Sequence, residues 1–274
     1  MNPRFAAVIR ARNEEKHIKN AIIGLQKQTV DLNRIVVVDD GSTDKTSKIA
    51  SELGCTVISL PFHKNSYVGT PKMAERWNIG LQNIDKDNQD YVLLLDADHI
   101  LPSRYVEEIL KHMQNNSKLV IAGGWIKGEP FEESWPRGSG RIVKARFWKE
   151  LNNMQYPVLW CWEEWLCYKA LQLGYEVRAF RDVTSEVQRH TGKRSFEAWG
   201  WGKAMYALGY DWKFALVRCL ITFLHSPRLG VSMFQGWVQY GGVEKADIAS
   251  WVNYTQKKQF YKRMFKFLRR VGRE

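Results

Sequence analysis

Short runs of β-branched and aliphatic residues recur through the first half of the chain, and stretches with helical spacing of apolar positions separate them. The runs predict strands at residues 5–9, 34–38, 56–60, 91–95 and 119–122. The intervening stretches predict helices at residues 14–28, 42–53, 72–81 and 102–113. Strands that alternate with helices form βαβ units. This order therefore predicts an α/β fold with a mostly parallel, twisted sheet flanked by helices.

The alternation weakens in the second half of the chain. Residues 141–147 are consistent with a further strand, and residues 163–173 with a helix. Beyond them the chain becomes rich in Trp, Tyr, Phe, Lys and Arg and predicts successive helices. We therefore expect a sheet-containing domain at residues 1–192 and a helical C-terminal extension at residues 193–274.

The composition limits the class of protein and of partner. The chain has 274 residues, of which 45% are hydrophobic, and this is enough to bury a sizeable core. The formal net charge is +12 and the pI is about 9.5. A polyanionic partner must therefore be considered, and nucleic acid, an anionic membrane surface and a phosphorylated substrate all fit that charge.

Cysteine usage and the lack of long apolar runs indicate the compartment. The four cysteines form no Cys-x-x-Cys pair, which argues against a zinc site or a disulfide framework and suggests a reducing environment. The N-terminus lacks the apolar region of a signal peptide. No apolar run reaches the roughly 18–20 residues that span a bilayer. We therefore expect a cytoplasmic protein.

Two acidic clusters each follow a predicted strand. Asp39 and Asp40 close the second strand, and Asp96 and Asp98 close the fourth. Carboxylates gathered at the carboxyl edge of a sheet repel each other unless a cation or a donor-rich ligand joins them. The clusters therefore indicate a divalent metal, a sugar nucleotide or both. The alternative is that each cluster is only a turn and a helix cap.

Two further groups are candidates for chemistry. Glu163 and Glu164 lie between two tryptophans, and apolar neighbours raise the pKa of a carboxyl group toward the range of a general base. The alternative is a pair of ordinary acids in the first turn of a helix. His190 is a candidate metal ligand or phosphate donor, and a surface histidine is the alternative.

The order of these segments is more specific than any one of them. The segments are Val8–Glu15, Val36–Asp44, Lys72–Gly80, Leu93–Asp98 and Glu163–Gly174. Taken together they resemble the family 2 glycosyltransferases, which have the GT-A fold, over roughly residues 5–192. The resemblance implies a nucleotide-sugar-binding and catalytic domain at residues 1–192.

The resemblance implies a role for each candidate. Asp40 would contact the nucleoside base, Asp96 the ribose and Asp98 a Mn2+ or Mg2+ ion that holds the donor diphosphate. Arg10 and Lys72 would belong to the donor site. His190 would supply a second contact to the metal or the diphosphate.

The same resemblance implies the reaction. The register of the acidic helix puts the catalytic base at Glu163, where the family usually has Asp, and Glu164 lies beside it, so either is a candidate. The base would deprotonate an acceptor for an inverting transfer of a sugar from a UDP sugar, or next a GDP sugar. The acceptor would be a hydroxyl or a lipid phosphate, in glycan, polysaccharide or glycolipid biosynthesis.

The C-terminal segment carries a separate signal. From Gln256 onward, basic residues and apolar residues alternate at helical spacing and predict a basic amphipathic helix. Such a helix fits peripheral contact with the cytoplasmic face of a membrane. The alternative is a helix that docks on the catalytic domain with its basic face in solvent.

Three other functions compete with the transferase. A nucleotidyltransferase of similar fold would normally show a Gly-rich loop after the first strand, and the segment from Arg10 to Glu15 has no glycine. A non-enzymatic protein that binds polyanions fits the charge, but no nucleic-acid-binding motif is present, so nucleic acid is not the expected partner. A degenerate, inactive transferase is the third, because Glu replaces the usual Asp.

Overall fold

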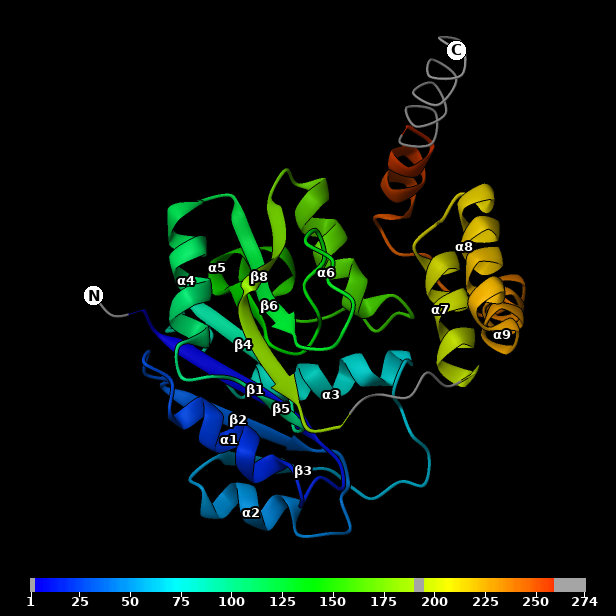
Figure 1. The fold of residues 1–274 in the computed structure, drawn as a ribbon. Coiled ribbons are helices and arrows are strands. Elements are labelled where there is room, and N and C mark those ends of the chain that lie inside the picture. Colours follow the sequence, from blue (N-terminus) through cyan, green and yellow to red (C-terminus); the bar gives the residue numbers. More distant parts are fainter. Residues whose placement is uncertain (1–2, 190–194, 259–274) are drawn as a thin grey trace. The chain divides into compact units, whose positions relative to one another are not determined.

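The computed structural model describes residues 3–189 and 195–258 (Figure 1). The described residues divide into two compact units. The first unit lies within Met1–Ser66, Ala74–Tyr156 and Leu173–Thr191. The second lies within Tyr67–Met73, Pro157–Gln172 and Gly192–Glu274.

A mixed sheet of eight strands among the described residues forms the centre of the first unit. The strands are β1 (Phe5–Ala11), β2 (Arg34–Asp39), β3 (Thr56–Ser59), β4 (Tyr91–Asp96), β5 (His99–Ile100), β6 (Leu119–Ile126), β7 (Arg141–Lys144) and β8 (Glu176–Val187). Their order is β3-β2-β1-β4-β7-β6-β8-β5. The strands from β3 to β4 in that order pair in parallel, as do β6 and β8, whereas β7 and β5 pair antiparallel with their neighbours. The predicted α/β fold with a mostly parallel sheet is confirmed.

The register of the parallel strands brings their acidic ends to one edge. Ala11 of β1 lies beside Asp39 of β2, and Arg10 of β1 lies beside Asp96 of β4. β1 is buried along nearly its whole length, as expected for a central parallel strand with both faces covered. The strands therefore present both acidic clusters on the same side of the core.

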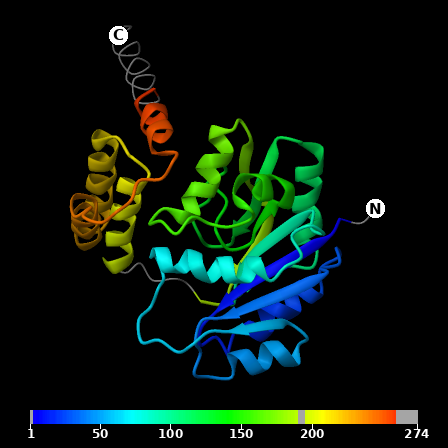
Figure 2. The same ribbon diagram turned by 180° about the vertical axis from the view of Figure 1, so that it is seen from behind.

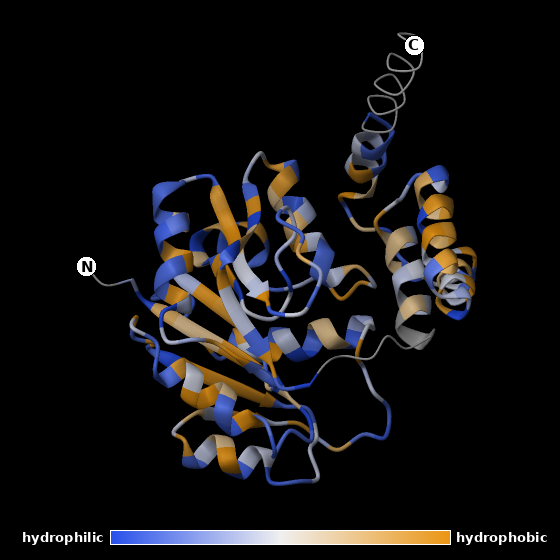
Figure 3. Cartoon of the chain, in the orientation of Figure 1, coloured by the Kyte–Doolittle hydropathy of each residue, from blue (hydrophilic) through white to orange (hydrophobic). Residues whose placement is uncertain are grey.

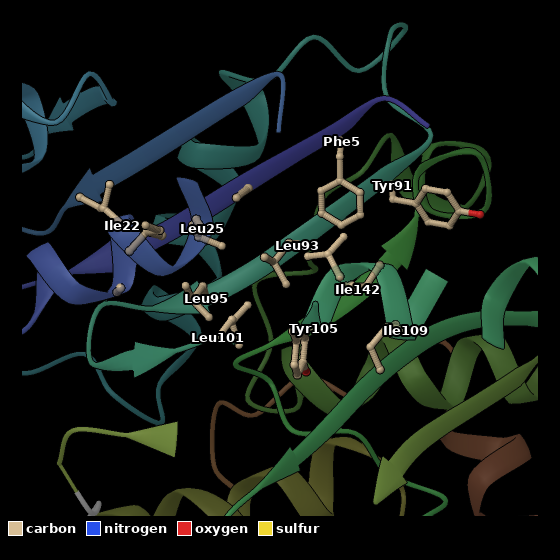
Figure 4. Packing of buried hydrophobic residues seen from close by; sticks show 14 of the residues in the cluster. Phe5, Ile22, Leu25, Tyr91, Leu93, Leu95, Leu101, Tyr105, Ile109 and Ile142 are labelled. Atoms are coloured by element: carbon tan, nitrogen blue, oxygen red, sulfur yellow. The ribbon is translucent and has the colours of Figure 1, made fainter. Parts of the chain in front are cut away.

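Helices cover both faces of these strands, as the two opposite views show (Figures 1 and 2). The helices of the first unit are α1 (Ile18–Gln26), α2 (Thr46–Glu52), most of α3 (Pro71–Gln82), α4 (Tyr105–Asn115) and α5 (Ala145–Asn152). α1 and α4 bury their apolar stripes in one cluster with the odd-numbered side chains of β1, part of which is shown in Figure 4. α3 covers the opposite face, where Gly80 approaches Val8 and Val38.

Two predicted boundaries were wrong. The strand expected at residues 141–147 ends at Lys144, and α5 begins at Ala145, because Ala145 and Trp148 bury one helical face. The helix expected from residue 42 begins only at Thr46. Residues 42 and 43 are instead bonded to Asn13 in the neighbouring loop.

Two strands were not predicted, the two-residue β5 and the long β8. β8 runs for 12 residues and alternates buried and exposed positions over much of its length. Its exposed positions carry charged residues such as Glu176, Arg178 and Asp182. These residues have low strand propensity, so the segment lacks the continuous apolar run that marks the buried strands.

The second unit consists of helices and connecting loops in the part of the chain that is described. Its helices are α6 (Trp162–Gln172), α7 (Ser195–Ala207), α8 (Trp212–His225) and α9 (Pro227–Val238), and residues 249–258 are also helical. The main chains of α7 and α9 lie very close, because a Cβ at Gly236 would be 2.0 Å from the Trp199 carbonyl oxygen. The helices predicted beyond residue 195 are thus confirmed within the described residues.

Polar contacts join α6 to the later segments of this unit. The Trp165 indole and the Lys169 ammonium both donate to Asp247, and the Tyr168 hydroxyl lies 3.0 Å from that of Tyr210. The residues around Asp247 therefore hold the acidic helix in place within its unit.

Among the described helices, none combines the length and the apolar character needed to cross a membrane. The basic amphipathic helix predicted from Gln256 falls mostly on residues 259–274, outside the described ranges. That helix and the domain boundary at residue 192 stay predictions.

A substitution at Gly80 tests the packing of α3 on the sheet. A Cβ there would lie 2.4 Å from Cγ1 of Val8 and 2.9 Å from Cγ2 of Val38. Because buried β-branched side chains have few alternative rotamers, we expect Gly80→Ala to lower the free energy of unfolding by about 1–3 kcal/mol, measured by urea denaturation. Gly241→Ala is the matched control, because a Cβ there meets no atom within 4 Å. Equal stability of Gly80→Ala and the parent would contradict this packing.

Candidate functional site

The two aspartates that follow β2 have different roles. Asp39 accepts hydrogen bonds from the Ser42 N–H at 3.0 Å and from the Ser47 hydroxyl, so it shapes the turn. Gly41 is required in that turn, because it has φ +73° and a Cβ there would lie 2.7 Å from the Pro61 carbonyl oxygen. Asp39 is therefore a turn residue, which was the alternative interpretation of this acidic cluster.

Asp40 is contacted by an arginine and a histidine. Its side chain is only 1% exposed, and its Oδ1 accepts from Arg76 Nε at 2.9 Å and lies 3.0 Å from His63 Nε2. A buried carboxylate is costly unless it is paired and hydrogen-bonded, and these two side chains provide that pairing. Both contacts fall on one oxygen, so Asp40 keeps Oδ2 as an acceptor for a donor group of a ligand.

Arg12 fixes the loop that carries His63. Its guanidinium donates to the carbonyl oxygens of His63 and, at 2.6 Å, of Asn65. The Asn65 carbonyl oxygen is also 2.6 Å from Nδ1 of His63. The loop after β3 is thus tied to the end of β1, and the imidazole is held toward Asp40.

The main chain of Asp96 is held by a serine, and its side chain lies near an arginine. Its N–H donates to Ser139 Oγ at 2.9 Å, and that oxygen lies 2.7 Å from Nδ1 of buried His99. Burial lowers the pKa of His99 to about 4, so the imidazole is neutral at physiological pH. The Asp96 carboxylate lies 3.4 Å from Arg10, and both side chains keep partial access to solvent.

Asp98 is the carboxylate with the least compensated charge in this part of the site. Its side chain is 14% exposed, and Arg189 Nε lies 3.5 Å from its Oδ2. The same guanidinium is closer to Glu14, at 2.6 Å. Burial, and then the negative charges of Asp96 and Glu14, raise the pKa of Asp98 above its ordinary value. A further positive charge at this point would therefore be favourable.

The donor set at this edge suits a hard divalent cation. Asp96 and Asp98 offer carboxylate oxygens, which Mn2+ and Mg2+ bind together with water and phosphate oxygens. Within the described residues, no three His, Cys, Asp or Glu side chains are grouped to hold a metal by themselves. A metal here would need ligand oxygens or a residue outside the described ranges. His190, the predicted second contact, lies outside them.

The remaining predicted residues belong to the second unit. Glu163 and Glu164 lie in the first turn of α6, between the buried rings of Trp162 and Trp165. The Lys72 ammonium lies 4.9 Å from the centroid of the Tyr67 ring. The structure thus brings Arg10, Asp40, Asp96 and Asp98 together in the first unit, and the roles of Lys72 and the two glutamates stay predictions.

Several site residues were not predicted. They are the partners of the two carboxylates, namely His63 and Arg76 around Asp40, and Glu14 and Arg189 around Asp98. Glu14 and Arg76 lie inside the segments that carry the family resemblance, so their positions were a usable signal. His63 lies in a Pro- and Gly-rich loop with no pattern that marks it.

Comparison with known proteins gives the family. The sequence profile described as "Glycosyl transferase family 2" matches residues 6–171, which is more than half of the chain. The chain belongs to glycosyl transferase family 2. The family resemblance of the ordered segments is therefore confirmed.

Individual relatives are similar over part of their length. A UDP-N-acetylglucosamine–dolichyl-phosphate N-acetylglucosaminyltransferase of Methanococcus voltae is 30% identical over 135 aligned residues, which cover 44% of this chain and 51% of the relative. An uncharacterized glycosyltransferase of Haemophilus influenzae is 26% identical over 125 residues, which cover 46% of this chain and 37% of the relative. The chain thus spans about half or less of the length of these curated relatives.

Solved structures confirm the fold. A mannosyltransferase of Pyrobaculum calidifontis in complex with GDP-Man and Mn2+ superposes with a TM-score of 0.61 at 14% identity, over 97% of this chain and 83% of that chain. TarS of S. aureus in complex with UDP-GlcNAc gives a TM-score of 0.55 at 16% identity, over 75% and 66% of the two chains. At these identities the likeness shows a GT-A type fold.

The uncompensated charge of Asp98 makes a prediction about stability without ligand. Because its folded-state pKa is raised, ionised Asp98 opposes folding at neutral pH. We expect Asp98→Asn to stabilise the ligand-free protein by about 0.5–1.5 kcal/mol, seen as a higher melting temperature. The gain should shrink as the pH falls through the raised pKa of Asp98 and disappear below the ordinary pKa of Asp, where the parent side chain is protonated in both states.

The control for this prediction is Asp182→Asn, whose side chain is 74% exposed. This variant should melt within about a degree of the parent at every pH, as surface changes usually do. A lower melting temperature for Asp98→Asn at neutral pH would contradict the account, since it would mean that the contact with Arg189 outweighs the repulsion.

Proposed function

We propose that this protein is an inverting, metal-dependent glycosyltransferase that moves a sugar from a nucleoside diphosphate sugar to a hydroxyl or a lipid phosphate. The observation that carries this proposal is the pair of acidic strand ends at one sheet edge, where Asp40 has two partners on one oxygen and Asp98 shares one arginine with Glu14. Membership of family 2 supports sugar transfer as the reaction. The product would enter glycan, polysaccharide or glycolipid biosynthesis.

Asp40 is the proposed contact to the nucleoside base. Arg76 and His63 hold its carboxylate by one oxygen, so the other would accept an N–H of the base. UDP sugars are the favoured donors and GDP sugars the next. The archaeal relative is named for a UDP sugar, and the superposed structures contain UDP-GlcNAc and GDP-Man. Arg10 and Asp96 would lie near the ribose, and Lys72 would support the nucleotide.

Asp98 is the proposed metal-binding carboxylate, with His190 as a further contact. A bound Mn2+ or Mg2+ would neutralise the diphosphate that leaves. The Mn2+ in the mannosyltransferase complex supports this assignment. The raised pKa of Asp98 is the local reason to expect a cation, because ion binding relieves its repulsion from Asp96 and Glu14.

Glu163 or Glu164 is the proposed general base. Each would accept the proton of the acceptor hydroxyl while that oxygen attacks the anomeric carbon, opposite the departing diphosphate, which inverts the configuration there. An acceptor phosphate is already anionic and would need this base less. The four cysteines of the sequence form no Cys-x-x-Cys pair, which supports a cytoplasmic location, with peripheral contact at the membrane face.

Ligand-induced stabilisation tests the donor site. We expect UDP-GlcNAc together with Mn2+ to raise the melting temperature of the parent, because a ligand at about 100 times its Kd adds about 2.7 kcal/mol to the free energy of unfolding. Asp98→Asn should lose this shift, although it melts higher without ligand, and Asp182→Asn should keep it. GDP-Man and the nucleotides without metal complete the panel.

Two outcomes would contradict the donor site. One is the absence of any shift with UDP or GDP sugars in the presence of either metal, together with tight, salt-sensitive binding of DNA, which would favour a polyanion-binding protein. The other is an equal shift in Asp98→Asn and in the parent, which would remove Asp98 from the metal site.

Conservative variants identify the base. Glu163→Gln and Glu164→Gln keep the shape and remove the charge. We expect the variant that lacks the base to release nucleoside diphosphate from the donor about 10²–10⁴ times more slowly, with unchanged donor binding. The other variant is the matched control and should stay within a few fold of the parent. Water is the acceptor in this assay. If both variants are as active as the parent, a glutamate base in α6 is excluded.

A further inference from the structure

The exposed apolar residues of the second unit are concentrated on α8. Val217, Leu220, Ile221 and Leu224 are each between 50% and 80% exposed. Their spacing of three and four residues places them on one face of the helix. Figure 3 shows the hydrophobic residues along α8. A soluble helix normally turns this kind of stripe toward its core, and α8 turns it outward.

The neighbouring helix extends the same kind of surface. On α9, Val231, Phe234 and Val238 recur at spacings of three and four residues and are 40–46% exposed. The two helices meet through small residues, because a Cβ at Gly230 would lie 2.4 Å from the Phe223 Cα. This close approach leaves the larger apolar side chains outside. We call the paired helices, residues 212–238, the α8–α9 hairpin.

The charge of the hairpin has one sign. Residues 212–243 contain no Asp or Glu, whereas they contain Lys213, Arg218 and Arg228. Arg218 and Lys213 lie on α8, the helix that carries the exposed stripe. Trp212, 59% exposed, and Tyr240, 50% exposed, stand at the two ends of this segment. Apolar stripes with basic residues and terminal aromatic rings are the pattern of helices that lie in a membrane interface.

The length of α8 decides how it would meet a bilayer. Its 14 residues extend about 21 Å, which is short of the roughly 30 Å of the hydrocarbon core. The helix can therefore lie in the interface but not cross it. We propose that the α8–α9 hairpin is a docking surface for an anionic lipid bilayer. This surface is distinct from the basic C-terminal segment predicted from Gln256, and it does not depend on the donor or acceptor of the transferase.

Charge favours a lipid surface over a second copy of this chain. In a symmetric dimer the same patch would face itself, and the cations of the two hairpins would be brought together without an acid among residues 212–243 to pair with them. An anionic bilayer instead offers phosphate groups to Lys213, Arg218 and Arg228 and apolar chains to the stripe.

Vesicle flotation with the full chain tests the proposal. The probes are vesicles of phosphatidylcholine alone and of phosphatidylcholine mixed with phosphatidylglycerol. We expect the parent to float with the mixed vesicles and not with the neutral ones. Leu220→Glu should weaken partition about tenfold or more, because it removes apolar burial and adds repulsion from the anionic surface. Leu173→Glu is the matched control, because Leu173 has the same 53% exposure as Leu220 and belongs to the other unit.

Two further experiments separate the alternatives. A variant of the C-terminal segment distinguishes binding through the hairpin from binding through that segment, and a second measurement tests for a dimer. The triple variant Lys266→Glu with Arg269→Glu and Arg270→Glu should still bind the mixed vesicles. Adding Leu220→Glu to it should weaken that binding, as it does in the parent. Sedimentation velocity without vesicles reports any dimer.

Any one of five results would overturn the proposal. The first is that the parent binds neither kind of vesicle, and the second is that it binds both kinds equally. The third is that Leu220→Glu and Leu173→Glu bind the mixed vesicles alike. The fourth is that only the triple variant loses binding. The fifth is that the parent is a dimer and that Leu220→Glu dissociates it. The shift caused by UDP-GlcNAc and Mn2+ should be unchanged in Leu220→Glu, so failure here is distinguishable from failure of the donor site.

Discussion

Negative charge at the carboxyl edge of the sheet is the constraint around which the first unit is arranged. Parallel strands β1, β2 and β4 end at the same edge of the sheet, so the aspartates at the ends of β2 and β4 are brought together there. Arginine and histidine side chains from distant segments contact these carboxylates. Arg76 and His63 pair with Asp40, Arg10 lies by Asp96, and Arg189 is shared between Glu14 and Asp98. The same contacts also hold the segments that carry these arginine and histidine side chains.

The two ends of this edge differ in how completely their charge is balanced, and that difference is the basis of the proposed chemistry. Asp40 is held by Arg76 and His63 and is almost fully buried, so it is a rigid acceptor suited to recognition. Asp98 shares Arg189 with Glu14, which lies closer to that arginine, and it is repelled by both Glu14 and Asp96, so its ionised form destabilises the fold. A site that is unfavourable without its ligand and favourable with it is a common exchange of stability for function.

Sequence patterns were informative where local chemistry decides the structure. The buried parallel strands leave continuous aliphatic runs, and the acidic residues that close them were found for that reason. The partners of Asp40 were not found, because His63 and Arg76 are 23 and 36 residues away and reach it only through the tertiary arrangement. β8 was missed because its exposed positions carry charges. The outward-facing stripe of α8 was also unrecognised, since periodicity shows that a helix has an apolar face and not which way that face points.

The central claim is that a nucleoside diphosphate and a divalent cation complete this acidic edge together. Electron paramagnetic resonance of Mn2+ tests it most directly, because the signal of the hydrated ion is lost when the ion is bound. We expect UDP to make the parent remove this signal at concentrations where neither UDP nor protein alone does, and Asp98→Asn to leave it in place. A signal that the parent leaves unchanged in the presence of UDP and of GDP would contradict the account.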